Sequence, residues 1–309
     1  MIRRIGATTG DQRLNGAVFV AIALIGGGNA VGVVVAVQEL DPFWAAATRF
    51  LAAGIIFAIG MAVLRIPIPR GRAFVGSLIY GVFGFFGAFA FLFSGLRETP
   101  AGTAQTIIAL VPLLTLLLAV AHGLERFSVR ALLGALIAFG GLVFLVADRI
   151  DANVPLLSLL AVVAGAALLA ESGVVLKLTP RAHPVASNAV GMLGGGVLLL
   201  VLSAIAGDAW LAPVQSDTWA AMVFLVLGGS VAVFGLFVFL LGRWTASAVS
   251  YVLLLQPLAT IAYSAVLTQE PITPALFAGA AVILLGVYVG AFAPRRSPVP
   301  TEDPAGGVA

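Results

Sequence analysis

Hydrophobic residues fill most of this chain in long blocks, and short connectors between the blocks hold the prolines and charges. A membrane-spanning helix requires about 20 mostly apolar residues. Ten blocks have that length: Asn15–Val37, Phe43–Leu64, Ala73–Gly95, Ala101–Ala121, Phe127–Ala147, Pro155–Leu176, Pro184–Ala206, Thr218–Gly242, Thr245–Leu267 and Thr273–Ala293. The pattern predicts an all-α integral membrane protein with ten transmembrane helices.

An internal repeat divides these helices into two groups. Ala101–Ala147 aligns without a gap on Ala246–Phe292, at an offset of 145 residues. The matched pairs that are not aliphatic are Pro112 and Pro257, Thr115 and Thr260, Glu125 and Glu270, Gly134 and Gly279, and Gly141 and Gly286. The repeat predicts a duplicated five-helix unit at 15–147 and 155–293. Residues 1–14 form an N-terminal segment, and 294–309 are a Pro-, Gly- and acid-rich tail of the kind that stays disordered.

The positive charges follow one side of the predicted topology. With the N-terminus in the cytoplasm, the outer loops hold only Arg97 and Arg149. The inner segments hold Arg3, Arg4, Arg13, Arg65, Arg70, Arg72, Arg126, Arg130, Lys177, Arg181, Arg243, Arg295 and Arg296. This asymmetry predicts a multi-pass protein of the bacterial inner membrane with both termini in the cytoplasm.

An odd number of helices in each unit makes the second unit enter the membrane from the opposite side. The two copies are therefore expected to be inverted relative to one another. Inverted repeats are typical of carriers that work by alternating access, in which a site near the bilayer midplane opens to either face.

The composition excludes several other classes of protein. Of the 309 residues 61% are hydrophobic and only 9% are charged, against roughly 25% charged in soluble domains. The basic residues are scattered between apolar blocks, which argues against nucleic acid as a partner. There is no cysteine, and neither histidine is expected at mid-membrane, so no metal, no other cofactor and no enzymatic activity are expected.

Several of these features together resemble the EamA-type carriers of the drug/metabolite transporter superfamily. The resemblance rests on Arg49-Phe50 after Asp41-Pro42-Phe43, Ala101 to Pro112, Leu124-Glu125, Gly134, Gly141, Lys177, Ala246 to Pro257, Glu270, Gly279 and Gly286. It covers nearly the whole chain, and it is closest to the bacterial YddG-type exporters of aromatic amino acids. It implies a ten-helix basket around a central pathway, with helices five and ten at the periphery.

Polar residues beside the two repeated prolines are the first candidates for the pathway. A proline in mid-span removes a backbone hydrogen bond and exposes a carbonyl group, as in the broken helices that line carrier sites. Gln105, Pro112 and Thr115 share one face of the fourth helix, and Ser250 and Pro257 occupy matching positions on the ninth. Packing between helices is the alternative role for these polar groups.

Further candidates lie elsewhere along the spans. Asn29 stands beside three glycines in the first helix. Gln256 is expected at the midplane, where it binds substrate or forms a hydrogen bond between helices. Tyr80, Phe86, Tyr251 and Tyr263 are the candidate aromatic side chains for an apolar cavity wall.

Charged residues within the spans have two competing interpretations. Glu171 serves either proton coupling or a structural pair with Lys177, six residues further along. Arg49 either has a structural role or holds an anionic group such as a carboxylate. Glu125 and Glu270 precede the fifth and tenth helices and are expected to cap them.

These observations predict a secondary transporter that exports small metabolites, most of all amino acids, including aromatic ones. The partners are therefore a small-molecule substrate and the lipid bilayer. Export of other metabolites or drugs, and channel-like facilitation, remain alternatives.

Overall fold

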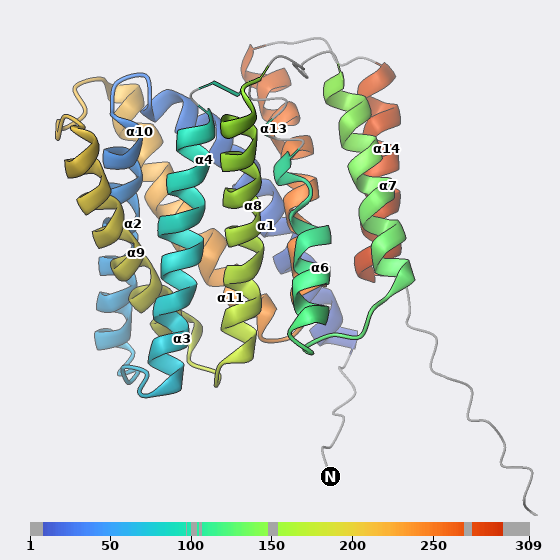
Figure 1. Cartoon of the computed structure of the whole chain (residues 1–309), viewed down its shortest axis with the longest axis horizontal. Helices are drawn as coiled ribbons and strands as arrows, with labels where there is room; N and C mark the ends of the chain where they lie inside the picture. Colours follow the sequence, from blue (N-terminus) through green and yellow to red (C-terminus); the bar gives the residue numbers. More distant parts are fainter. Residues whose placement is uncertain are drawn as a thin grey trace, which may run out of the picture.

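The computed structural model describes residues 9–96, 98–99, 104, 107–147, 154–268 and 274–292, and every regular element in these residues is a helix (Figure 1). The elements are α1 (Thr9–Ala36), α2 (Pro42–Val63), α3 (Arg72–Gly81), η1 (Val82–Gly87), α4 (Ala88–Leu96), α6 (Val111–Ala121), α7 (Val129–Val146), α8 (Leu156–Leu178), α9 (Pro184–Ala206), α10 (Ser216–Phe224), η3 (Leu225–Ala232), α11 (Val233–Leu241), α12 (Ala246–Ser250), α13 (Val252–Thr268), α14 (Pro274–Val287) and η4 (Tyr288–Phe292).

Six helical segments of the described chain are long and apolar enough to cross a membrane. They include two composite helices, Arg72–Leu96 and Ser216–Leu241. The other four predicted spans contain shorter apolar helices, at Val111–Ala121, Val129–Phe144, Ala246–Thr260 and Phe277–Phe292. The all-helical fold is confirmed, with six full-length spans; the count of ten stays a prediction.

Short polar signals set the helix ends. Pro42 and Pro184 occupy the first turns of α2 and α9, where their missing N–H groups have no intrahelical partner to lose. The Ser128 side chain accepts a hydrogen bond from the Ala131 amide and caps α7. Gly207 ends α9 with a φ of 78°, a left-handed conformation that glycine adopts without strain.

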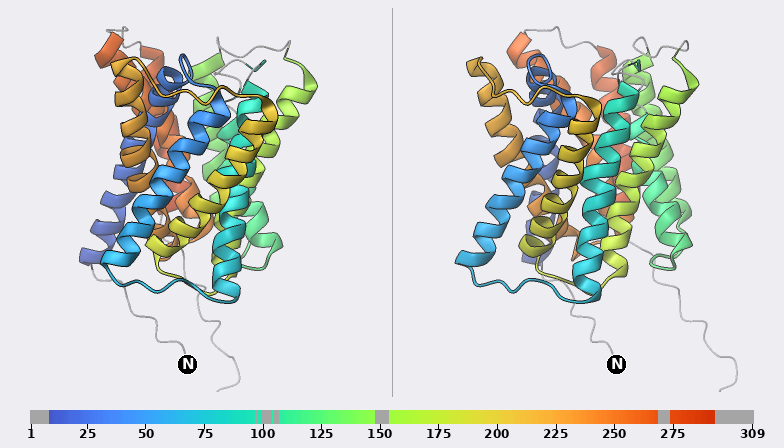
Figure 2. Two further views of the ribbon diagram at one scale, coloured as in Figure 1. Left: turned by 90° about the vertical axis from the view of Figure 1, so that its left-hand side faces the viewer. Right: turned by 60° about the vertical axis from the view of Figure 1, so that its left-hand side comes forward.

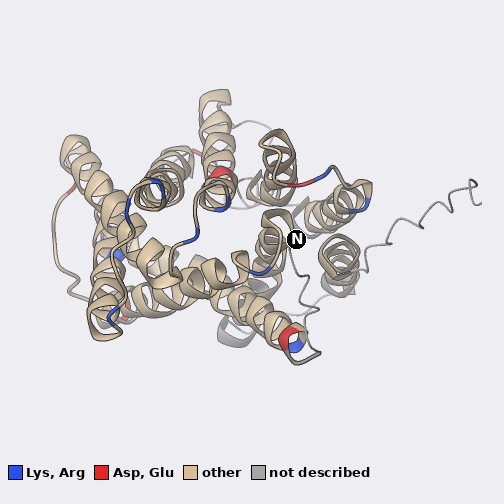
Figure 3. Ribbon diagram, turned by 90° about the horizontal axis from the view of Figure 1, so that it is seen from below, with Lys and Arg blue, Asp and Glu red and all other residues tan. Residues whose placement is uncertain are grey.

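The helices stand side by side in a bundle, and α1 begins at the same face at which η4 ends (Figures 1 and 2). This is the lower face in Figure 1, and the opposite one is called the upper face. Seen from below, the lower face carries most of the Lys and Arg residues of the described chain (Figure 3). The predicted charge asymmetry is therefore present in the fold.

Helices α7 and α14 run side by side along one edge of the bundle (Figure 1). Glycines allow this contact: a Cβ on Gly134 would lie 2.5 Å from Gly290, and one on Gly286 would lie 2.4 Å from the Ala138 amide nitrogen. The peripheral place implied for helices five and ten agrees with this arrangement.

A second close crossing joins the two halves of the chain, because α3 meets α9 at Gly81 and Gly191. A Cβ on Gly81 would lie 2.1 Å from the Gly191 carbonyl oxygen and 2.5 Å from its Cα. These are backbone atoms, which cannot rotate away as the end of a side chain can.

Replacing Gly81 with valine is therefore expected to lower stability by about 1–3 kcal/mol, the usual cost of overpacking a close contact. The measurement is the thermal unfolding temperature of purified protein in detergent. Gly140 on α7 is the matched control, because nothing lies within 4 Å of a Cβ built there. Equal losses for Gly81→Val and Gly140→Val would contradict the proposed crossing.

Two π-helical segments occupy the middles of the composite helices. At the repeat offset of 145 residues, η1 corresponds to 227–232, which falls inside η3. Such segments break the regular α-helical hydrogen-bond ladder and often occur at functional sites. The two repeats thus share a distortion of the same helix.

On the upper face, the connection between α9 and α10 is fastened to the start of α2. The Trp44 amide donates to Asp208 at 3.0 Å, the Trp44 indole donates to the Leu211 carbonyl at 2.8 Å, and the Trp44 and Trp210 rings stack. Hydrogen bonds from the Thr218 hydroxyl and the Val214 amide lower the pKa of Glu39 from its ordinary value, so this carboxylate stays ionised in the same junction.

Candidate substrate cavity

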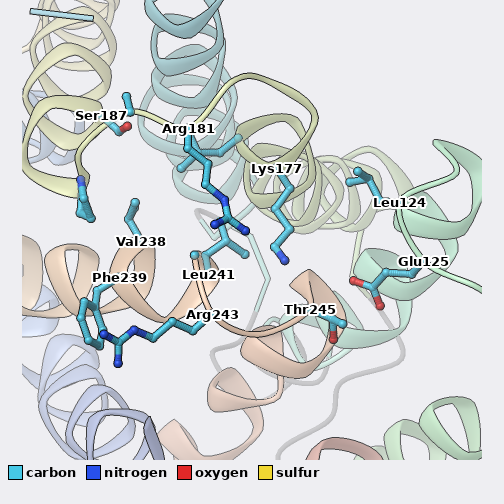
Figure 4. A pocket seen from close by; sticks show the side chains of 14 residues that line it. Leu124, Glu125, Lys177, Arg181, Ser187, Val238, Phe239, Leu241, Arg243 and Thr245 are labelled. Carbon is cyan, nitrogen blue, oxygen red and sulfur yellow. The ribbon is translucent and has the colours of Figure 1, made fainter. Parts of the chain in front are cut away.

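A cavity of about 510 Å³ opens at the lower face, between the ends of α8 and α11 and the start of α9 (Figure 4). Its lining mixes charged and apolar side chains. The residues are Leu124, Glu125, Leu176, Lys177, Arg181, Ala182, Pro184, Ser187, Val238, Phe239, Leu241, Gly242, Arg243 and Thr245. A space of this size with a few convergent polar groups is typical of small-molecule sites.

Three cations and one carboxylate line this cavity. Lys177 donates to the Trp244 carbonyl and lies close enough to Glu125 for electrostatic attraction. Arg243 donates to Asn15 at 3.1 Å, and its guanidinium lies 4.1 Å from the centre of the Phe239 ring. Arg181 is exposed and extends into the opening (Figure 4). The excess of positive charge favours an anionic group in a ligand.

The carboxylate of Glu125 has a different role from the one its sequence position predicts. It accepts hydrogen bonds from the Ser247 amide, at 3.1 Å, and from the Ser247 hydroxyl. Glu125 therefore caps α12, in the other repeat, while Ser128 caps α7. The prediction that Glu125 caps the fifth helix is wrong, because the chain turn after α6 carries the carboxylate across to the second repeat. Glu270 lies outside the described residues.

A second cavity, of about 660 Å³, adjoins the first and shares Leu124, Glu125 and Thr245 with it. It lies between the end of α6, the start of α7, α12 and η4, and Arg126 and Arg130 add further positive charge. The two cavities together make the lower face of the bundle hollow and basic.

Arg49 lies in the half of the bundle nearer the upper face and is only 4% exposed. Its Nε donates to the Ser230 hydroxyl at 2.7 Å, and its Nη2 donates to the Asn29 side chain at 3.1 Å and to the Gly229 carbonyl at 3.0 Å. The Asn29 amide also lies 3.4 Å from the Gly229 carbonyl. We call Asn29, Arg49, Gly229 and Ser230 the arginine cluster; it ties α1 and α2 to η3.

The structural role proposed for Arg49 explains every contact of the arginine cluster. Among the described residues its hydrogen-bond partners Asn29, Gly229 and Ser230 are neutral, and all belong to neighbouring helices. The guanidinium also lies 5.1 Å from the centre of the Phe50 ring and 5.9 Å from that of Phe89. The cluster therefore holds α1, α2 and η3 together in the half of the bundle nearer the upper face.

The candidate residues of the ninth helix pack against α1. A Cβ on Gly26 would lie 2.3 Å from the Gln256 side-chain nitrogen, Thr260 donates to the Gly27 carbonyl at 2.7 Å, and Tyr263 donates to the Leu24 carbonyl at 2.9 Å. The Gln256 side chain therefore packs against α1, and its role in the pathway stays a prediction. Pro257 lies inside α13.

Other candidates are buried in helix contacts. Tyr80 and Tyr251 are each 1% exposed; Tyr80 donates to Asn188 at 3.3 Å, and Tyr251 donates to the Ala131 carbonyl. Thr115 and Ser250 donate to carbonyls of their own helices, at 2.7 and 2.8 Å. Pro112 lies in the first turn of α6, and Phe86 is half-buried in η1. Gln105 lies outside the described residues.

Glu171 pairs with His122, 3.4 Å away, and Lys177 has other partners. The predicted pair of Glu171 with Lys177 is therefore wrong: the end of α6 brings an imidazole to the carboxylate from a neighbouring helix. Of the described candidates, Lys177 alone lines either cavity. The sequence analysis assigned no site role to Arg181, Arg243 or His122. Their positions in or beside the basic connectors of the inner face could have indicated one.

An apolar helical bundle with a basic cavity at one face is typical of membrane transporters. The sequence pattern of the EamA-like transporter family matches residues 15–147 and 156–291. The chain belongs to this family, with one copy of the domain in each half.

Curated relatives agree with this assignment. The chain is 24% identical over 296 residues to a probable amino-acid metabolite efflux pump of Escherichia coli (strain K12), covering 92% of this chain and 97% of the relative. The corresponding protein of Salmonella typhimurium is 24% identical, covering 91% and 96%. An uncharacterised transporter of Archaeoglobus fulgidus is 26% identical, covering 82% and 90%. These relatives are named as transporters, and this chain is a transporter and not an enzyme.

A solved crystal structure has the same fold. It superposes with a TM-score of 0.78 at 22% sequence identity, over 90% of this chain and 96% of the other. The arrangement of the helices is therefore shared across the length of both chains.

Proposed function

We propose that the protein is an inner-membrane exporter of amino acids, including aromatic ones, that takes its substrate from the cytoplasm into the lower cavity. The observation that carries this proposal is the convergence of Lys177, Arg181 and Arg243 on a cavity whose other walls are largely apolar. Cations bind a substrate carboxylate by charge-assisted hydrogen bonds, and apolar walls accept a bulky side chain. The family relatives named as amino-acid metabolite efflux pumps support the same substrate class.

The direction of transport is proposed from where the fold is open and where it is closed. The basic lower face is the cytoplasmic side by the positive-inside rule, and both cavities open there. In this proposal the upper side is closed by the arginine cluster and by the contacts of Trp44 with the connection between α9 and α10. Alternating access would then require the arginine cluster to separate while the lower cavity closes. Ten spans, with both termini in the cytoplasm, complete this proposal.

Counterflow in proteoliposomes tests the proposed function. Purified protein is reconstituted with unlabelled phenylalanine inside, and uptake of labelled phenylalanine is followed. We expect saturable exchange, inhibited by leucine and threonine and much less by phenylalaninamide, which lacks the carboxylate. Exchange of none of these amino acids would refute the substrate class. Linear, unsaturable flux would support a channel-like facilitator instead, and equal inhibition by the amide would contradict the role of the cations.

A further inference from the structure

His122 contacts Glu171 through one imidazole nitrogen, and its other imidazole nitrogen has a partner of its own. His122 Nδ1 lies 2.9 Å from the Leu118 carbonyl oxygen. A carbonyl oxygen only accepts hydrogen bonds, so Nδ1 must carry a hydrogen. His122 Nε2 lies 3.4 Å from the Glu171 Oε1 oxygen.

If the imidazole were neutral and Glu171 ionised, two lone pairs would face each other across this contact. Since Nδ1 already carries the hydrogen of the neutral ring, Nε2 would have none to donate. The contact is favourable only when one further proton is present, either on Nε2 beside a carboxylate or on the carboxyl group beside a neutral ring. A proton between His122 Nε2 and Glu171 Oε1 would satisfy both atoms.

The second carboxylate oxygen of Glu171 is left without a partner. Glu171 Oε2 is buried and has no hydrogen-bond partner among the described residues. Burying an unpaired carboxylate oxygen is costly. The side chain of His122 is 37% exposed at the end of α6, so water at the lower face reaches one end of the pair. Glu171 lies seven residues inside the end of α8, about 10 Å along the helix.

The other ionisable groups near this pair either form hydrogen bonds with other partners or belong to the charged lower face. On α8, Lys177 donates to the Trp244 carbonyl, and after α6 Glu125 accepts from Ser247. On α3, Tyr80 donates to Asn188. The remaining charged groups of the adjoining elements are Arg72 on α3, Arg126 after α6, and Arg130 on α7; α4, η1 and α12 contribute none.

We propose that His122 and Glu171 form the proton-binding site that couples this transporter to the proton gradient. The proposal rests on the proposed function for the identity of the exchanged substrate and goes beyond it in naming the coupling ion and its residues. A proton that enters from the outer side as substrate leaves is held between Glu171 and His122, and His122 Nε2 passes it to water at the cytoplasmic face. In each cycle the pair thus binds one proton from the outer side and releases one proton to the cytoplasmic side.

Proteoliposomes with a pH-sensitive dye inside test the coupling. In wild-type protein, an imposed pH gradient should drive phenylalanine accumulation, and a phenylalanine gradient should move protons. Glu171→Gln and His122→Gln should abolish both effects and retain phenylalanine exchange. His183→Gln, which changes the other histidine of the chain, should behave as wild type; the His183 side chain accepts a hydrogen bond from the Val185 amide at the start of α9.

The outcomes separate the two proposals. Wild-type protein that exchanges no amino acid contradicts the proposed function. Wild-type exchange that no pH gradient influences, or variants at Glu171 and His122 that keep their coupling, contradict the proton site alone. Loss of exchange in a variant that elutes like the wild-type protein also contradicts it, because the pair would then act in substrate transport itself.

A spectroscopic measurement tests the pair without transport. The chain has two histidines, so a His183→Ser variant with ¹⁵N-labelled histidine reports His122 alone. We expect Nδ1 to appear as a protonated nitrogen and the Nε2 signal to move when Glu171 is changed to glutamine. An unprotonated Nδ1, or an Nε2 signal that ignores Glu171, would overturn the proposal.

Discussion

Arg49→Met will destabilise the protein strongly, because it removes the one side chain that joins three helices in the arginine cluster. The Asn29 oxygen, the Gly229 carbonyl and the Ser230 hydroxyl would each lose a donor. A buried polar group left without its partner costs about 1–3 kcal/mol. The thermal unfolding temperature in detergent and the yield of monodisperse protein are the measurements, and both should fall.

Two further variants show what kind of interaction is lost. Arg49→Lys keeps the charge but lacks the planar fork that reaches several acceptors, so we expect only partial recovery. Arg72→Met removes an exposed arginine at the start of α3 and should leave the unfolding temperature unchanged. Full stability of Arg49→Lys would show that charge, and not the fork, is what the cluster requires.

Arg181→Glu will raise the substrate concentration needed for half-maximal phenylalanine exchange. A hydrogen bond to a charged group contributes about 1.5–3 kcal/mol, and each 1.4 kcal/mol is a factor of ten, so the increase is about 10- to 100-fold. Because Arg181 is exposed, we expect the variant to fold like the wild-type protein. Initial rates of exchange in proteoliposomes give the measurement.

Arg72→Glu is the matched control for this charge reversal. It changes the net charge of the same face by the same amount, but Arg72 lines neither of the two described cavities. Its half-saturating concentration should stay that of the wild type, and Arg181→Lys should restore most of the affinity. Equal effects at Arg72 and Arg181 would indicate attraction by the whole face and contradict a site in the cavity.

The fold was readable from the sequence because its signals are local or periodic. Long apolar blocks and the arginines of the short connectors are read from residues near one another in the chain, and the repeat around Pro112 and Pro257 is a match at one fixed offset. The structure confirms six full-length spans and an entirely helical described chain. The π-helical segments were missed, since nothing in their apolar sequences, VFGFFG and LVLGGSVA, separates them from an ordinary α-helix.

The candidate site was less predictable, because it depends on which helices are neighbours. Glu125 and Ser247 are 122 residues apart, and Arg49 and Ser230 are 181 apart. Spacing along one helix placed Glu171 with Lys177, whereas packing brought His122 closer. Packing also adds contacts that polarity within a span does not reveal: Gln256, Thr260 and Tyr263 lie against α1, and the pathway role of Gln256 and Tyr263 stays a prediction. The charged residues of the cavity lie at or just after helix ends, whereas most of the predicted site residues lie in the middle of spans.

The matching positions of η1 and η3 bear on how the protein arose. A distortion acquired separately by each half would have no reason to fall at the same place in two inverted helices. Its common register at an offset of 145 residues is what the duplication of one ancestral unit that already carried the distortion would leave.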